Sequence, residues 1–188
     1  MCAYIINISD TSTNNDDTMD LDSQMDLDYR ANMAVVGRNP FILNDTMMKT
    51  KVIPLSLDYN AMQDISIIDA AVVYDFSYFN KSRILVLQNS LYVPAMVNNL
   101  ILPFILRESG IQVNDVPKIQ VENLTIKDHS IYLPNKDVRI PLSLFGIFSY
   151  FQSRKPKQSV FEYGAHLMRA VIECAHCNVT YGTNISIS

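Results

Sequence analysis

The sequence predicts a mainly β fold with one short helix and an appended β-hairpin, and two observations carry this prediction. Between residues 27 and 93 the chain is rich in β-branched and aromatic residues, and turn-forming residues interrupt it at short intervals. A single segment, residues 98–109, instead combines the start and stop signals of a helix. The strands expected in the first part are residues 34–36, 50–57, 66–75 and 83–93, with turns at 58–60 and 77–81.

Three residues define the helix expected at 98–109. Asn98 is a good N-cap, and Pro103 falls in the first turns, where a missing N–H costs least. Gly110 suits the left-handed position that follows a helix. A return strand is expected directly afterwards, at residues 111–113.

A β-hairpin is expected after this return strand. Its strands are residues 130–134 and 138–144, and the turn between them is at 135–137. Beyond Arg154 the strand pattern lapses, and only a weak helical period follows.

Length and composition predict one domain with divergent ends. The chain has 188 residues, of which 48% are hydrophobic and 18% charged, so it is long enough to bury a core. Residues 9–26 are polar and acidic without an apolar period, and they cannot bury enough surface to offset the entropy lost on ordering. We therefore expect a disordered acidic arm at 1–26, a β domain at 27–120, an appended β-hairpin segment at 121–156 and a divergent tail at 157–188.

Charge and apolar runs exclude two classes of partner. The formal net charge is −4, and the Lys and Arg residues are spread out apart from one cluster at 154–157, so we expect no nucleic-acid partner. Residues 100–106 and 140–151 are the longest apolar runs, and prolines interrupt both. Neither run can span a bilayer, so we expect no membrane partner.

The cysteines indicate a reducing compartment. Cys2, Cys174 and Cys177 are odd in number and do not form a disulfide framework. The first eight residues lack the basic start and the full apolar core of a secretory signal. We therefore expect an intracellular, cytoplasmic protein.

The most informative motif surrounds Asp28. An apolar residue, Leu27, precedes this aspartate, and the residues after it are Tyr29-Arg30-Ala31-Asn32. An Ala-Val-Val-Gly strand follows at 34–37. The motif predicts a carboxylate presented at a tight turn between two strands.

Together with two further blocks, this motif resembles the retropepsin-like aspartic protease region of copia-type LTR retrotransposon Gag-Pol polyproteins. The second block is Leu-Gln-Asn-Ser-Leu-Tyr-Val-Pro at 87–94, leading to Asn-Leu-Ile at 99–101, and the third is Gly110, which ends the helix. Residues 128–151 are also similar to the stretch that follows the protease in one branch of these transposable elements. The resemblance covers about residues 27–156.

The resemblance implies a small, mostly antiparallel retropepsin-like β-barrel with one short helix, acting as a homodimer. Asp28 would be the catalytic residue, one from each subunit. Two such carboxylates share one proton, so that one activates water as a general base while its protonated partner polarises the peptide carbonyl. The hydrolase would cut polyprotein peptides bound as extended strands, without a cofactor or a metal. The Asp28 turn should pack against the helix, with Leu100, Ile101 and Ile105 facing it.

Two residues of the turn depart from the family pattern. The family has a small hydroxyl residue and then glycine (histidine in one branch) where this chain has Tyr29 and Arg30. A guanidinium near paired carboxylates favours the charged form of both and removes the shared proton, and Tyr29 adds bulk. These residues favour a catalytically impaired relic of a polyprotein protease. The alternative is an active aspartic endopeptidase that cleaves the retrotransposon polyprotein as a homodimer.

Two other groupings were weighed as sites. Cys174-Ala175-His176-Cys177, with His166 upstream, has too few ligands for a closed structural zinc site. Asp128 and His129 are adjacent, and adjacent residues on a strand face opposite ways, so they do not predict a catalytic pair.

Overall fold

The computed structural model describes residues 3–8, 23–38, 40–53, 60–76, 81–116, 123, 125–134 and 137–156, with backbone alone at 3–8, 76 and 81. The chain divides into two compact units, 1–156 and 157–188, and every described residue belongs to the first. The division falls where the divergent tail was predicted to begin. Cys174, Cys177 and the histidines near them lie outside the described residues.

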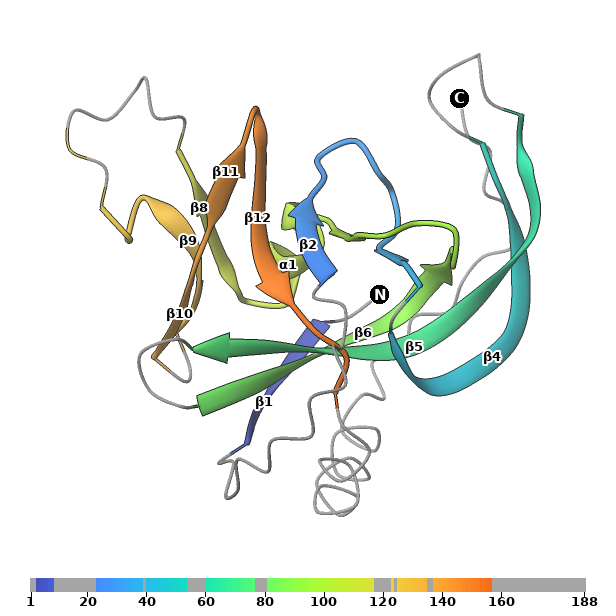
Figure 1. Cartoon of the computed structure of the whole chain (residues 1–188), viewed down its shortest axis with the longest axis horizontal. Coiled ribbons are helices and arrows are strands. Elements are labelled where there is room, and N and C mark those ends of the chain that lie inside the picture. Colours follow the sequence, from blue (N-terminus) through green and yellow to red (C-terminus); the bar gives the residue numbers. More distant parts are fainter. Residues whose placement is uncertain are drawn as a thin grey trace. The chain divides into compact units, whose positions relative to one another are not determined.

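The described part of the chain is mainly β, as predicted, with one short helix (Figure 1). One mixed sheet has the strand order β11-β12-β2-β7-β3-β6-β5-β4, with β1 also paired to β6, and a smaller sheet has the order β10-β9-β8. The elements are β1 (Ala3–Ile8), β2 (Ser23–Leu27), β3 (Val35–Val36), β4 (Phe41–Val52), β5 (Met62–Phe76), β6 (Lys81–Tyr92), β7 (Asn99–Ile101), α1 (Pro103–Glu108), β8 (Gln112–Asp115), β9 (His129–Leu133), β10 (Val138–Pro141), β11 (Ser143–Phe145) and β12 (Phe148–Ser153).

The larger sheet is open, which corrects the expectation of a closed barrel. Closure requires the first and last strands of the sheet to pair, but here they are β11 and β4, and neither has a second partner among the described strands. The sheet is also mixed, because β2 pairs with β7 and β3 pairs with β6 in parallel. Beyond β6 it continues as a long β4–β5 hairpin with several register shifts (Figure 1).

Most predicted strands are present, with different ends. β3, β5, β6 and β9 lie at the predicted places. The strand predicted at 138–144 is divided: β10 ends at Pro141, and residues 143 and 144 belong to β11 in the larger sheet. β4 begins at Phe41, well before the predicted residue 50, and residues 54–57 lie outside the described part. The prediction missed the first part of β4 because it is an edge strand, exposed along most of its length and without a simple alternation of apolar and polar residues.

The predicted helix begins too early, because its first residues form a strand. Residues 99–101 are β7, which pairs with β2 and β3, so tertiary hydrogen bonds override the helical pattern there. Leu102, not Asn98, precedes the helix, and Pro103 is its first residue. Gly110 has φ +76°, which confirms the left-handed position after the helix. Within the described residues, no helix has the length and apolar character needed to cross a membrane.

Two parts of the predicted disordered arm are ordered strands. β1 pairs with β6, and β2 pairs with both β7 and β12. In β2 the side chains of Ser23, Met25 and Leu27 are buried and those between them are half-buried, a period of two that the acidic composition concealed. The intervening residues 9–22 lie outside the described part.

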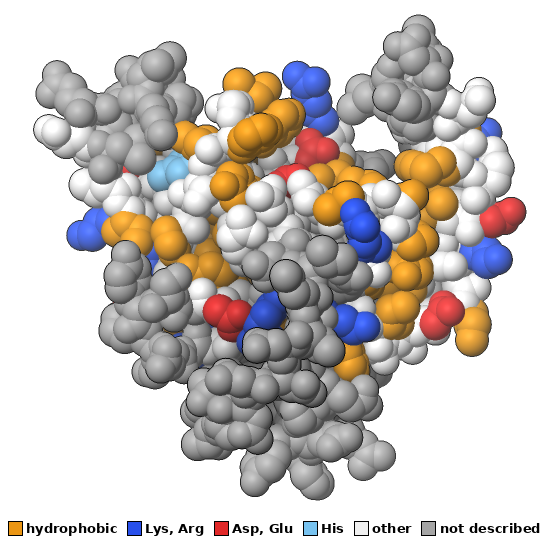
Figure 2. All heavy atoms as spheres, viewed as in Figure 1, with side chains coloured by type: hydrophobic (Ala, Val, Ile, Leu, Met, Phe, Trp, Pro, Cys, Tyr) orange, Lys and Arg blue, Asp and Glu red, His pale blue; other side chains and the backbone are white. Residues whose placement is uncertain are grey.

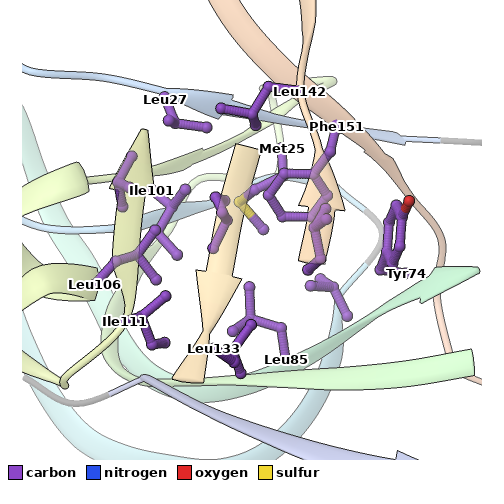
Figure 3. Close-up of a cluster of buried hydrophobic side chains, with 14 of the residues drawn as sticks. Met25, Leu27, Tyr74, Leu85, Ile101, Leu106, Ile111, Leu133, Leu142 and Phe151 are labelled. Carbon is purple, nitrogen blue, oxygen red and sulfur yellow. The ribbon is translucent and has the colours of Figure 1, made fainter. Parts of the chain in front are cut away.

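The hairpin segment is integral to the fold rather than appended. β9 pairs with β8, and β12 pairs with β2, so residues on both sides of position 120 share the same sheets. One buried cluster joins both sheets and the helix; its side chains include Met25, Leu85, Leu106, Leu133 and Phe151 (Figure 3). The ring of Tyr74 meets that of Phe151 edge-on, with centroids 5.8 Å apart. The 120/121 boundary therefore does not separate two folding units.

Candidate functional site

The turn that begins at Asp28 lies directly against the end of β7. The backbone N–H of Asp28 donates to the carbonyl oxygen of Ile101 at 3.0 Å. Its half-buried carboxylate accepts a hydrogen bond from the backbone N–H of Arg30, at 2.8 Å from Oδ1. An aspartate that accepts from the main chain two residues later stabilises a turn locally. The predicted position of Asp28, at the start of a turn and beside the helix, is confirmed.

The turn packs on the helix through small and apolar side chains. Ala31 contacts a buried cluster formed by Ala34, Leu102 and Ile105. Of the three residues expected to face the turn, only Ile105 does so through its side chain. The side chain of Ile101 lies in the main buried cluster, and Ile101 contacts the turn through its carbonyl oxygen alone. Leu100 instead packs with Val35 and its neighbours on β6, because alternate residues of β7 face opposite ways.

Blocks that are far apart in the sequence meet at β3. Val35 pairs in parallel with Leu91 of β6 and antiparallel with Leu100 of β7. The N–H of Leu91 donates to Ala34 O, and the N–H of Val93 donates to Val36 O, both at 2.9 Å. The aspartate motif, the 87–94 block and the 99–101 block therefore form one structural unit.

Gly37 ends this unit at a position where no side chain fits. A Cβ atom there would lie 2.6 Å from Met96 O and 2.9 Å from Asn98 O. The N–H of Gly37 donates to Asn99 Oδ1 at 2.9 Å, and Asn99 is only 2% exposed. The Asn99 amide nitrogen in turn donates to Ser23 Oγ at 3.3 Å. The glycine of the Val-Val-Gly motif is thus required by close backbone packing.

Tyr29 is directed toward its own chain rather than toward Asp28. Its hydroxyl donates to Asp115 Oδ2 at 3.1 Å, and the guanidinium carbon of Arg107 lies 6.0 Å from its ring centroid. Burial raises the pKa of the Tyr29 phenol, the charge and the hydrogen bond of Asp115 raise it further, and Arg107 opposes the shift. The ring nevertheless remains 55% exposed.

Arg30 is exposed, and its main chain, not its guanidinium, contacts Asp28. The only Arg30–Asp28 hydrogen bond in the described part of the chain is the backbone one, and no ion pair joins the two side chains there. The direct charge contact expected from the sequence is therefore not found. On the face that Figure 2 shows, Lys and Arg side chains are scattered, with acidic ones among them.

Asp115, at the end of β8, connects the turn to three strands, a role that no motif in the sequence indicates. Its Oδ1 accepts from Ser149 Oγ at 2.6 Å and lies 3.3 Å from His129 Nδ1, a contact without good hydrogen-bond geometry. His129 and Ser149 are 5% and 4% exposed. Asp115 and His129 are register partners across β8 and β9, which sequence separation alone does not reveal.

Asp128 does not join this cluster. Its Oδ2 accepts from the hydroxyl of Thr125 at 2.6 Å and from the backbone N–H of Thr125 at 2.9 Å. These two hydrogen bonds lower the pKa of the exposed Asp128 carboxyl. Asp128 lies in the turn before β9, which begins at His129.

Within the described residues, no three or more His, Cys, Asp or Glu side chains are grouped so as to hold a metal ion. Comparisons with the models of known protein families, with curated proteins and with solved structures find no match for this chain. The functional assignment therefore depends on the geometry of the Asp28 turn.

Proposed function

We propose that this chain is a retrotransposon-derived, retropepsin-like domain, a catalytically impaired relic of a Gag-Pol polyprotein protease. The observation that carries the proposal is the turn at Asp28, whose motif meets the 87–94 and 99–101 segments and packs against the helix. Such a scaffold supports the presentation of a carboxylate at a fixed position. The two residues next to the carboxylate carry the impairment.

The impairment follows from what the chemistry requires. Peptide hydrolysis by an aspartate pair needs two carboxylates close enough to share one proton, so that one is a base and the other a donor. One chain supplies only Asp28, so two turns must approach each other. The exposed side chains of Tyr29 and Arg30 occupy the turn itself and obstruct that approach.

The alternative function is an active aspartic endopeptidase that cleaves the polyprotein as a homodimer. One observation favours it: the guanidinium of Arg30 forms no ion pair with Asp28 in the described structure. The Asp28 side chain then has no ion pair with Arg30 that must break before a second copy approaches. The two functions differ in whether the side chains at positions 29 and 30 permit the turns to meet.

A peptide-cleavage assay from acidic to neutral pH separates the two functions. We expect no cleavage by the unmodified chain and pepstatin-sensitive cleavage by the double variant Tyr29→Ser, Arg30→Gly. Adding Asp28→Asn to that variant should abolish the cleavage, because an amide is not a base.

A second double variant controls for the loss of a tyrosine and an arginine. Tyr132→Ser with Arg139→Gly removes another such pair, stacked at 4.2 Å on the β9–β10 hairpin, and should leave the chain inactive. Pepstatin-sensitive cleavage by the unmodified chain would establish the alternative. An inactive Tyr29→Ser, Arg30→Gly variant that is folded would contradict the assignment of the impairment to these two residues.

A further inference from the structure

The contacts of Tyr29 form a connected set that the Asp28 chemistry does not use. Its hydroxyl reaches Asp115, and its ring lies beside Arg107 of α1. Arg107 is itself fixed, because its Nη2 donates to Val113 O on β8 at 3.2 Å. The side chain of Tyr29 is therefore held at both its ring and its hydroxyl, although it is half exposed.

Asp115, the acceptor for that hydroxyl, is largely buried and has a second donor. Its side chain is only 16% exposed, and the buried hydroxyl of Ser149 on β12 donates to it at 2.6 Å. β12 in turn pairs with β2, the strand that leads into the Asp28 turn. A carboxylate fixed by a charge-assisted hydrogen bond has little orientational freedom left to lose when a second donor binds it.

We propose that Asp115 is a positioning residue that holds the Asp28 turn in place within a single chain, acting through the hydroxyl of Tyr29. The contact spans the turn, β8 and β12, so the turn is held without a contribution from a second copy. Tyr29, which is unfavourable for dimer catalysis, is in this role an intrachain brace. The inference rests on the proposed function only in naming the turn that is braced.

The chain contains a matched control for this contact. The hydroxyl of Tyr132 donates to Asp137 Oδ1 at 3.1 Å, which is the same distance as between Tyr29 and Asp115. Its ring also lies beside an arginine, Arg139. This second pair is on the β9–β10 hairpin, and within the described residues none of its hydrogen bonds reaches the Asp28 turn. Tyr132→Phe thus makes the same chemical change as Tyr29→Phe, but on the β9–β10 hairpin.

Amide hydrogen exchange measured by NMR tests the brace. In Tyr29→Phe and in Asp115→Asn we expect the backbone N–H of Arg30 to exchange about two- to tenfold faster, the range for the loss of one hydrogen bond. Tyr132→Phe should leave that rate unchanged. Equal rates in Tyr29→Phe and the unmodified chain would overturn the proposal, and so would an equal effect of Tyr132→Phe.

A spectroscopic measurement separates positioning through the carboxylate from a general loss of structure. In the full chain with labelled tyrosine ring carbons, Asp115→Asn should move the pKa of Tyr29 down toward 10, because it removes a nearby negative charge. Ser149→Ala keeps that charge and should leave the pKa raised. A Tyr29 pKa that is the same in Asp115→Asn and the unmodified chain would contradict the contact. Neither measurement depends on peptide cleavage, so cleavage by the unmodified chain would overturn the proposed function alone.

Discussion

Replacing Gly37 with alanine tests the packing that supports the candidate turn. The new Cβ would lie 2.6 Å and 2.9 Å from two main-chain oxygens, those of Met96 and Asn98. Neither oxygen can rotate away as a side chain can, and Met96 O also accepts a hydrogen bond from the N–H of Arg38 at 3.0 Å. The strand of Gly37 must therefore shift away from the segment that precedes β7.

The expected cost follows from three effects. Forcing a methyl group into a closed site costs about 1–3 kcal/mol, and contact with two backbone atoms favours the upper end. The shift also weakens the hydrogen bond from Gly37 N–H to Asn99, which is worth about 1 kcal/mol. Alanine restricts the unfolded chain and offsets about 0.5 kcal/mol of this loss. We expect the free energy of unfolding to fall by about 3 kcal/mol.

Urea denaturation followed by far-UV circular dichroism measures this change. The control is Gly146→Ala in the β11–β12 turn, where a Cβ meets no heavy atom within 4 Å and φ is +61°. That substitution costs only the left-handed backbone conformation, about 1 kcal/mol. If Gly37→Ala is no more destabilising than Gly146→Ala, the close packing of the Val-Val-Gly motif is not what stabilises the turn.

Two further predictions concern polar contacts. Asn99→Ala should lower the free energy of unfolding, measured by urea denaturation, by about 2 kcal/mol, because the N–H of Gly37 loses its buried acceptor. The control is Asn98→Ala, at a half-buried residue, which should lower it by less than about 1 kcal/mol. Equal losses would contradict the argument from burial. Burial raises the pKa of Asp75, but hydrogen bonds from Arg154 and Ser82 lower it more, so that the pKa lies below its ordinary value of 3.8. The stabilisation from this depressed pKa is present above pH 3.8 and is lost as the pH falls through the folded-state value. Arg154→Met should therefore raise the pKa of Asp75 in a carboxyl NMR titration and flatten the loss of thermal stability on acidification; an unchanged pKa would contradict this assignment.

Local sequence signals predicted the elements whose stability is local. The β9–β10 hairpin and the glycine after the helix follow from turn chemistry and from backbone freedom at Gly110, and both are present. The predicted start of the helix was wrong because Asn99–Ile101 is compatible with a helix in isolation and forms a strand only through its pairing with β2 and β3. The first part of β4 was not predicted because an exposed edge strand does not need alternating apolar and polar residues.

The candidate site also has one part that the sequence predicts and one part that it does not. The position of Asp28 beside Ile101 was predicted from the resemblance, which implies that the turn packs against the helix that follows Ile101. The contact between Tyr29 and Asp115 was not predictable. The two residues are separated by 86 positions, and Asp115 reaches the turn only through the register of β8 and β9 and the pairing of β12 with β2.

The buried contacts that hold the strands beside the turn are separate from the exposed side chains at positions 29 and 30. The turn is held by the backbone N–H of Asp28, by the close packing of Gly37 and by the buried side chain of Asn99. These contacts do not involve the exposed side chains at positions 29 and 30; the proposed brace from Tyr29 to Asp115 is an addition to them. Substitutions at exposed positions usually change stability by about 0.5 kcal/mol or less. A chain of this kind can therefore carry a tyrosine and an arginine at positions 29 and 30 and keep its fold.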